Sequence, residues 1–306
     1  MFRLTIVALA VAVACPIAAQ PINAPSLPHK LVEGWAKLPA GMNFGECTGV
    51  SCDRDDNVWI FNRGAHAVVQ LDRNGNFLRS WTNVPVKSAH GLRIDSSGDV
   101  WGIDVAAHMV LKFSVDGRVK MVLGGQGGNP SADNNDPYAF NRPTSVAFDE
   151  KGNFYVSDGY GNTRVAKYSK DGEYLKQWGV AGKGDGEFNL VHDVVLDQAG
   201  RVYVADRAND RVQVFDQEGR FLNKWSGVGQ PWGLAYSKKE NAIYLCDGKN
   251  NRVLKLNTDG QVLGQLGGFG KAPGKLDFAH HIAVDSRGAI YVAEVKNWRV
   301  QKWALE

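Results

Sequence analysis

Short apolar runs separated by turn residues recur along almost the whole chain, and one stretch shows the unit clearly. Apolar and β-branched residues alternate with polar ones over 145–149, 154–158, 164–168 and 174–179. Gly152 lies in the first turn, and Asp171 and Gly172 lie in the last, where tight turns favour such residues. Alternation of period two with turns about every 8–12 residues is typical of β-strands, so we expect an all-β chain with four strands per repeat.

This unit occurs six times. The first strands open near residues 47, 89, 143, 191, 231 and 279, a mean spacing of about 46 residues, which is usual for propeller blades. The sixth repeat has only three strands, and the early segment 31–36 has the pattern of the fourth. We therefore expect one domain over residues 21–306, a six-bladed β-propeller whose ring is closed by an N-terminal strand that completes the last blade. These repeats resemble the NHL-repeat family of six-bladed propellers.

Composition and the N-terminus narrow the setting. The 306 residues are 44% hydrophobic and 22% charged, with a formal net charge of +3. The charges are interspersed, so no basic stripe indicates nucleic acid. Residues 1–20 have the form of a secretory signal peptide, with Arg3, an apolar run ending at Ala14 and small residues near the expected cut. We expect a secreted or periplasmic monomer without a membrane span, because the run is too short for one. Ala14-Cys15 resembles a lipoprotein cleavage site only loosely, so a lipoprotein is the less favoured alternative.

Three cysteines remain after the signal segment: Cys47, Cys52 and Cys246. Export permits disulfides. On one extended strand, however, Cys47 and Cys52 are roughly 16 Å apart, beyond the reach of a disulfide. Buried free thiols are the favoured interpretation, and the sequence leaves the pairing open.

A polar motif follows the second strand of several repeats. It reads Asp158…Asn162…Arg164, Asp206…Asn209…Arg211 and Asp247…Asn251-Arg252. The Asp and Arg flank one loop, so we expect them to tie the second strand to the third. We interpret the motif as structural.

Candidate chemistry lies in the second position of the six first strands, where the residues are Thr48, His90, Thr144, His192, Trp232 and His280. Histidine occupies every other repeat, although the chain has only 7 histidines. In a closed ring the three imidazoles face one axis. Three neutral imidazoles with an open fourth position are a catalytic zinc arrangement, and copper, iron or nickel also bind imidazole. The alternative is a chance coincidence of three histidines. Alternation points His281 away from the axis, in a structural role.

The same residues carry a closer resemblance, to the peptidyl-α-hydroxyglycine α-amidating lyase (peptidylamidoglycolate lyase) family. The family implies a six-bladed propeller with zinc held by three histidines, which splits a C-terminal α-hydroxyglycine into an amide and glyoxylate. The motifs that carry the resemblance are His90-Gly91-Leu92, Arg142-Pro143-Thr144, Asp158-Gly159-Tyr160-Gly161-Asn162-Thr163-Arg164, Gln177-Trp178-Gly179, Val191-His192, Ala205-Asp206-Arg207 and Asp277-Phe278-Ala279-His280.

The resemblance assigns roles to particular residues. It implies that His90, His192 and His280 bind zinc. Tyr160 matches the catalytic tyrosine, Arg63 matches the arginine that activates it, and Arg207 matches a rim arginine that binds a substrate carboxylate. An unperturbed tyrosine loses its proton only near pH 10, and neighbouring cations favour the charged form. The expected substrate is a small acyl- or peptidyl-α-hydroxyglycine.

The chain departs from the family at two positions, and two alternative functions stay open. Where this chain has His281, the family commonly has an Asp that helps to hold a structural calcium ion. Where this chain has Gly161, the family has a cysteine that forms a disulfide. Calcium is therefore in doubt and that disulfide is absent. One alternative function is a secreted, non-catalytic propeller that binds a protein or glycan and holds a structural metal ion. The other is a calcium-dependent lactonase-type propeller, which the three histidines disfavour because that class prefers carboxylates and Asn at the axis.

Overall fold

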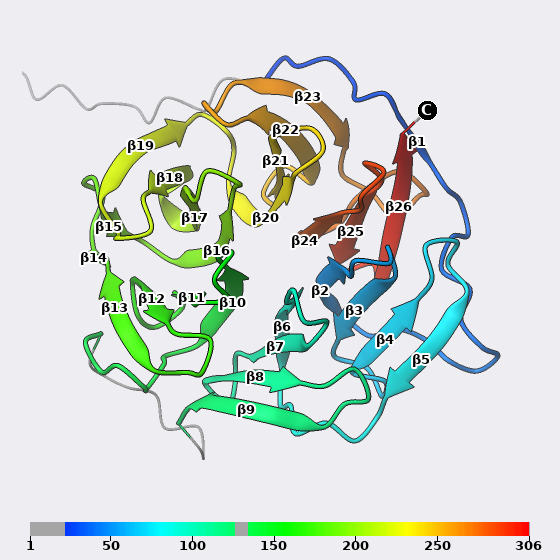
Figure 1. Ribbon diagram of the computed structural model, residues 1–306. Coiled ribbons are helices and arrows are strands. Elements are labelled where there is room, and N and C mark those ends of the chain that lie inside the picture. Colours follow the sequence, from blue (N-terminus) through cyan, green and yellow to red (C-terminus); the bar gives the residue numbers. More distant parts are fainter. Residues whose placement is uncertain (1–21, 126–133, 306) are drawn as a thin grey trace, which may run out of the picture.

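Six four-stranded antiparallel sheets stand around a central axis, as the computed structural model shows (Figure 1). The structure describes residues 22–125 and 134–305, so the expected signal peptide lies outside the described residues. Blades one to three comprise β2 (Cys47–Cys52), β3 (Val58–Asn62), β4 (Val68–Leu71) and β5 (Phe77–Trp81); β6 (Ala89–Ile94), β7 (Val100–Asp104), β8 (Met109–Phe113) and β9 (Val119–Gly124); β10 (Pro143–Phe148), β11 (Phe154–Asp158), β12 (Arg164–Tyr168) and β13 (Tyr174–Trp178).

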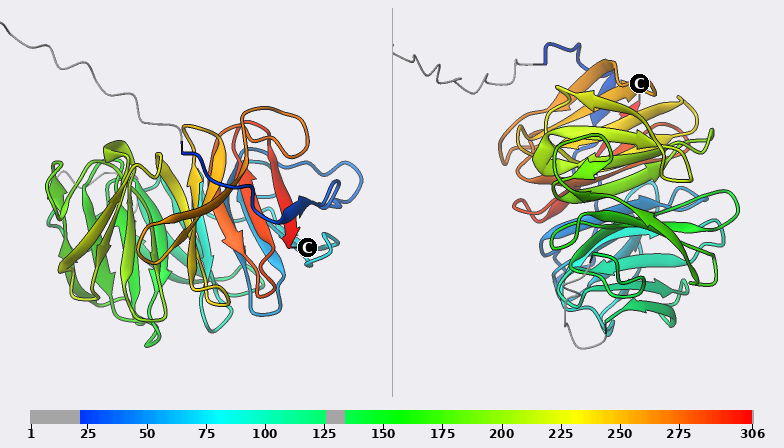
Figure 2. Two further views of the ribbon diagram at one scale, coloured as in Figure 1. Left: turned by 90° about the horizontal axis from the view of Figure 1, so that it is seen from above. Right: turned by 90° about the vertical axis from the view of Figure 1, so that its left-hand side faces the viewer.

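The other three blades complete the ring, and Figure 2 shows it from the side as a broad disc. Blades four to six comprise β16 (Val191–Leu196), β17 (Val202–Asp206), β18 (Arg211–Phe215) and β19 (Phe221–Ser226); β20 (Pro231–Ser237), β21 (Ala242–Asp247), β22 (Arg252–Asn257) and β23 (Val262–Gly267); β24 (Ala279–Val284), β25 (Ile290–Glu294), β26 (Arg299–Leu305) and β1 (His29–Leu31). A short parallel pair, β14 (Val180–Ala181) and β15 (Glu187–Phe188), and one 3-10 turn, η1 (Arg207–Asn209), lie outside these sheets. The predicted six-bladed all-β fold is confirmed.

The last blade is closed by the N-terminal segment, as expected, but by other residues. β1 pairs with β26, so that His29 faces Leu305 and Leu31 faces Trp303. The predicted bounds 31–36 were wrong because Gly34 turns the chain with φ +62°. Beyond that turn Trp35 is buried, its ring centroid 5.1 Å from that of Tyr291. The segment therefore contributes both an edge strand and a core side chain.

Blade-on-blade packing changes the burial pattern that alternation predicts. Every residue of β3, β7, β11, β17 and β25 is buried, because neighbouring blades cover both faces of the inner strands. The outer strands β5, β9, β13 and β19 keep exposed positions. Each pair of neighbouring blades shares an apolar cluster, such as Trp59 and Phe61 of blade one against Leu92 of blade two. The core is therefore a ring of interfaces between blades, where burial of apolar area supplies most of the stabilisation.

The turn between the first two strands is held by a carboxylate. In blade three Asp149 accepts hydrogen bonds from the backbone N–H groups of Lys151 and Asn153. Gly152 between them has φ +83°, as the turn prediction requires.

The Asp-Asn-Arg motif ties the second strand to the third, as predicted. Arg164 is fully buried and donates from Nε to Asp158 at 3.0 Å, while Asn162 donates to the same carboxylate at 2.7 Å. In blade five the amide that bonds Asp247 belongs to Asn250, and Asn251 instead accepts from the backbone N–H of Phe278. Arg211 with Asp206 and Arg299 with Glu294 repeat the tie in blades four and six.

Two further expectations concern cysteines and membranes. Cys47, Cys52 and Cys246 are free thiols, as favoured. Across residues 22–125 and 134–305, no helix combines the length and apolar character that a membrane crossing requires.

We predict that Arg164→Ala lowers the free energy of unfolding by about 3–5 kcal/mol, because it leaves the Asp158 carboxylate buried without its cation. Urea denaturation monitored by tryptophan fluorescence measures the change. Arg118→Ala removes a matched but exposed arginine paired with Asp116 and should leave the midpoint unchanged. Equal destabilisation of the two variants would contradict a structural role for the buried tie.

Candidate active site

Every first strand has a β-bulge at its second position, the column that holds the three histidines. In blade four Val191 pairs with Asp206 and Asp193 pairs with Ala205, so His192 is the additional residue between them. The same irregularity lies at this position in the other five blades. A bulge turns one side chain away from the regular alternation and is common beside functional sites. The fold therefore directs this column of residues toward the axis.

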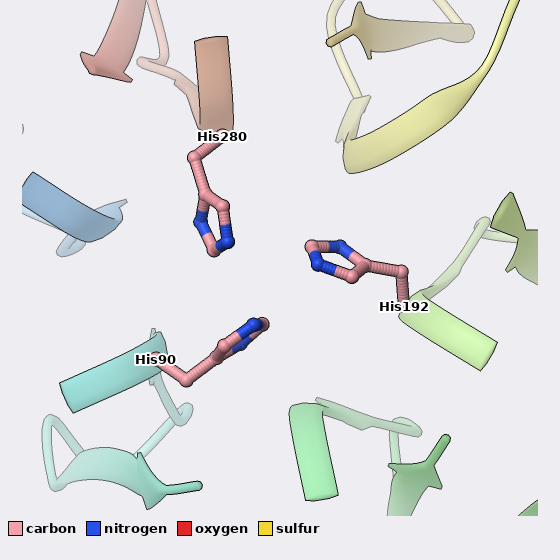
Figure 3. A group of neighbouring side chains, drawn as sticks. All are labelled: His90, His192 and His280. Atoms are coloured by element: carbon pink, nitrogen blue, oxygen red, sulfur yellow. The ribbon is translucent and has the colours of Figure 1, made fainter. Parts of the chain in front are cut away.

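The three histidines of this column converge from β6, β16 and β24 (Figure 3). Nitrogens of His90, His192 and His280 all lie within 4.8 Å of one another. The ring centroids are 4.6–5.0 Å apart, and no side chain is more than 3% exposed. The structure thus brings together the three residues that the sequence singled out.

Backbone carbonyls of the intervening blades orient the three imidazoles. Nδ1 of His90 lies 2.7 Å from the carbonyl oxygen of Thr144, and Nδ1 of His280 lies 2.7 Å from that of Thr48. His192 bonds the carbonyl of Trp232 in the same way. A carbonyl only accepts, so each Nδ1 carries the proton and each Nε2 keeps a free lone pair. The alternation of histidine with other residues therefore has a structural reason, because each histidine uses the backbone of the next blade.

The surroundings keep the imidazoles neutral. Burial lowers the pKa of His280 to about 3. Burial, followed by the neighbouring histidines, holds the pKa values of His90 and His192 well below their ordinary value. Neutral imidazoles with free Nε2 lone pairs are the donor set of a three-histidine zinc site. The residues present therefore fit a metal ion of the predicted kind.

Tyr160 lies directly against this cluster. Its hydroxyl is 3.0 Å from Nε2 of His192 and 3.4 Å from Nε2 of His90. Gly159 allows this approach, because a Cβ there would lie 1.7 Å from the carbonyl oxygen of Val191. The Asp-Gly-Tyr sequence thus places a phenol beside two of the three histidines.

Two predicted arginines approach the site differently. Arg207, at the start of η1, donates to the Tyr160 hydroxyl at 3.2 Å, and its guanidinium stacks 3.9 Å from the ring centroid of Trp232. Arg63 donates instead to the carbonyl of Ala89 at 3.1 Å and to Glu46 at 2.7 Å. The arginine beside the tyrosine hydroxyl is therefore Arg207, whereas the resemblance implied Arg63 for that place.

Two further residues of the site have no role in the prediction from sequence. Arg142 places its guanidinium 4.8 Å from the ring centroid of Tyr160, and Trp232 supports Arg207. Trp232 belongs to the axial column and was detectable there as its one tryptophan. Arg142 has φ +60° in front of Pro143, a conformation that local sequence does not reveal.

Beneath the histidines, Arg93 fills the place where calcium was in doubt. Its guanidinium donates to Nδ1 of His281 at 2.8 Å and to both Asp193 oxygens at 2.9–3.0 Å. It also bonds the carbonyl oxygens of Leu92 and Leu234. Calcium needs six to eight oxygen ligands, and here the nearby oxygens are bonded to an arginine while His281 offers nitrogen. These residues do not fit a calcium ion. The structural role expected for His281 agrees with this geometry, but the expected orientation was wrong, because His281 meets Arg93 at the axis instead of pointing away from it. Burial holds the pKa of His281 well below its ordinary value.

Comparison with known proteins adds to this geometry. Residues 140–168 and 188–215 match the model of the NHL repeat. The chain therefore contains NHL repeats within its six-bladed β-propeller. It is also similar in fold to a solved streptogramin B lyase, with a TM-score of 0.62 at 15% identity, over 87% of this chain and 95% of that one.

Curated relatives of this chain include proteins named as lyases. It is 36% identical to NHL repeat-containing protein 3 of Homo sapiens, over 65% of this chain and 60% of that protein. It is 31% identical to peptidyl-alpha-hydroxyglycine alpha-amidating lyase 1 of Drosophila melanogaster, over 60% of this chain and 40% of that protein. Peptidyl-glycine alpha-amidating monooxygenase B of Xenopus laevis is 29% identical over 60% of this chain and 24% of that protein. The aligned parts span less than two thirds of each relative.

We predict that Arg93 replaces a metal cation in stabilising the channel of the propeller. Arg93→Met should lower the free energy of unfolding by about 3–5 kcal/mol, because Asp193 is left buried and unpaired. Arg79→Met, which changes an exposed arginine of β5, serves as the matched control in chemical denaturation. Millimolar Ca²⁺ should not move the unfolding midpoint of the unmodified protein. A rise of the midpoint with Ca²⁺ would show that calcium binds after all.

Proposed function

We propose that this chain is a zinc-dependent lyase that cleaves N-acyl- or peptidyl-α-hydroxyglycine into an amide and glyoxylate. The observation that carries the proposal is the Tyr160 hydroxyl, placed against two imidazoles of a buried three-histidine cluster. Relatives named as amidating lyases support the same assignment.

The proposed reaction moves one proton and breaks one bond. The α-carbon of the substrate carries a hydroxyl, a carboxylate and the amide nitrogen. Loss of the hydroxyl proton lets the oxygen electrons form the aldehyde of glyoxylate while the carbon–nitrogen bond breaks. The departing nitrogen takes up a proton and becomes the primary amide, so no oxidant or reductant is required.

Tyr160 is the proposed base. As a phenolate its oxygen accepts the hydroxyl proton, and the resulting phenol can return a proton to the amide nitrogen. Arg207 stabilises the phenolate, because its N–H already points at the tyrosine oxygen from 3.2 Å. His90, His192 and His280 would hold the zinc ion, which would polarise a substrate oxygen as a Lewis acid.

The proposed anionic group of the substrate meets a cationic rim. Arg63 and Arg207 come from blades one and four, on opposite sides of the ring, and Arg142 lies between them in blade three. Both arginines have partners, Arg207 the tyrosine hydroxyl and Arg63 the exposed Glu46 carboxylate. We assign the substrate carboxylate to Arg63, where it would replace that of Glu46. Its guanidinium is held at the channel by the carbonyl of Ala89, next to His90. The cationic rim thus favours a carboxylate over a neutral or cationic ligand.

We predict one bound zinc ion per chain and release of glyoxylate from α-hydroxyhippurate. His192→Ala should lose both the metal and the activity. Tyr160→Phe should keep the metal and lower kcat about 10²–10⁴-fold, the usual contribution of a proton-transfer group. Metal analysis and a colorimetric glyoxylate assay measure these outcomes. His29→Ala, a histidine of the outer strand β1, is the control and should keep both properties.

Two results would count against this proposal in different ways. Bound zinc without turnover of any α-hydroxyglycine would favour the non-catalytic binding propeller. Purified protein that takes up no metal would remove both the metal site and the mechanism.

We predict that the two arginines separate in steady-state kinetics. Arg207→Met should lower kcat, because the phenolate loses its cation. Arg63→Met should mainly raise KM, because it removes binding shared by the substrate and the transition state. The reverse pattern would return the two residues to the roles implied by the family resemblance.

A further inference from the structure

A hollow of about 480 Å³ opens beside Arg63 on the face that carries Tyr160. One wall is the segment 41–46, which leads into β2, and another is the loop 63–66 of blade one. Trp298, from the loop between β25 and β26 of blade six, forms a third side. Arg63 connects the hollow to the histidines, because its Nε bonds the carbonyl of Ala89, the residue before His90. The hollow therefore adjoins the rim of the proposed active site at Arg63.

Trp298 has no evident structural reason to be a tryptophan. It is 59% exposed and has φ +51°. His108, Asp210 and Asn251 occupy the same place before the third strand of their blades, with φ between +53° and +59°. Asn and Asp tolerate this left-handed conformation through local hydrogen bonds, whereas a bulky aromatic residue does not. An exposed aromatic side chain held on a strained backbone is the kind of outlier that indicates ligand contact.

The lining of the hollow indicates what it would accept. Met42 and Phe44 line the same hollow and add apolar surface to it, and methionine adapts its shape to different apolar groups. The methylene stem of Arg63 extends this surface, while its guanidinium bonds the carbonyl of Ala89 and the Glu46 carboxylate. Glu46 places a carboxylate at the hollow, paired with Arg63 at 2.7 Å, which disfavours an anionic occupant. The expected occupant is uncharged and apolar.

We propose that this hollow binds the apolar group attached to the amide carbonyl of the substrate and so determines its acyl specificity. With the carboxylate on Arg63 and the hydroxyl at Tyr160, the remaining polar substituent of the α-carbon is the amide nitrogen and its acyl group. That acyl group leaves the channel past Arg63, where Trp298 and Met42 enclose it. The inference rests on the proposed lyase function. A small aromatic acyl group and an aromatic side chain of a peptide share this chemistry.

The test compares substrates that differ only in the acyl group. With the zinc-loaded enzyme, Trp298→Ala should raise KM about tenfold for an aromatic substrate, the usual effect of removing an apolar contact. N-acetyl-α-hydroxyglycine, which cannot reach the hollow, should keep its kinetics. α-Hydroxyhippurate tests the small-acyl source, and N-acetyl-phenylalanyl-α-hydroxyglycine against its alanyl analogue tests the peptide source. A higher KM of Trp298→Ala for either aromatic substrate supports binding in the hollow and identifies the occupant. An unchanged KM for both aromatic substrates overturns the inference.

Two controls keep the result interpretable. Phe269→Ala removes another exposed aromatic side chain, 72% accessible, from the loop after β23 and should change no substrate. Trp298→Gly suits φ +51° and replaces Trp298→Ala if that variant folds poorly.

A binding measurement separates failure of the hollow from failure of the lyase assignment. Benzamide, the amide expected from α-hydroxyhippurate, should bind the unmodified protein more tightly than acetamide in ligand-observed NMR, even without turnover. This preference should disappear in Trp298→Ala. Equal benzamide binding by both proteins would overturn the inference, whatever the activity. If Trp298→Ala loses the preference but the unmodified protein has no lyase activity, the hollow still binds apolar groups and the proposed lyase function is wrong.

Discussion

The hydrogen bond from each histidine Nδ1 to a carbonyl of the next blade is the interaction on which the site depends. Those carbonyls belong to Thr48, Thr144 and Trp232, so the backbone of blades one, three and five orients the side chains of blades two, four and six. The contact from His280 to Thr48 crosses the seam where the chain ends meet. Blade six is complete only because β1 pairs with β26. The orientation of His280 therefore depends on a contact between the first and last blades of the closed ring.

The axis of the propeller carries a second layer with the same three-blade arrangement. Arg93, Asp193 and His281 come from β6, β16 and β24, the strands that supply the histidines above them. The inner strands bring carbonyl oxygens such as those of Leu92 and Leu234 toward the axis, and buried acceptors require partners. A guanidinium supplies several donors in a fixed plane. Arg93 also lines a cavity of about 220 Å³ that is formed largely by residues of the first strands.

Much of this arrangement was readable from periodicity, and the exceptions have physical reasons. The repeat spacing determines which strands line the axis, so the convergence of the three histidines could be predicted from the sequence alone. The closing strand was misplaced because its three residues carry little pattern and Gly34 turns the chain directly afterwards. The approach of Arg207 to Tyr160 depends on two loops from different blades, and loop conformation is not encoded in strand periodicity. Arg93 reaches across the axis to residues 100 and 188 positions away, a separation at which one sequence shows no coupling.

Strained backbone gathers on the face of the ring that carries the proposed chemistry. Among the described residues other than glycine, positive φ occurs before first strands at Arg142, Leu190 and Phe278, and before third strands at His108, Asp210, Asn251 and Trp298. Only Asp56 and Asn241 lie in turns between first and second strands. Such conformations cost of order 1–3 kcal/mol each and persist where packing enforces them. Here the enforcing elements are the buried inner strands, which meet in apolar clusters at every blade interface. The rigid ring can thus hold the loops at the entrance of the channel in strained conformations. The same loops would not keep these conformations without the packed strands beneath them.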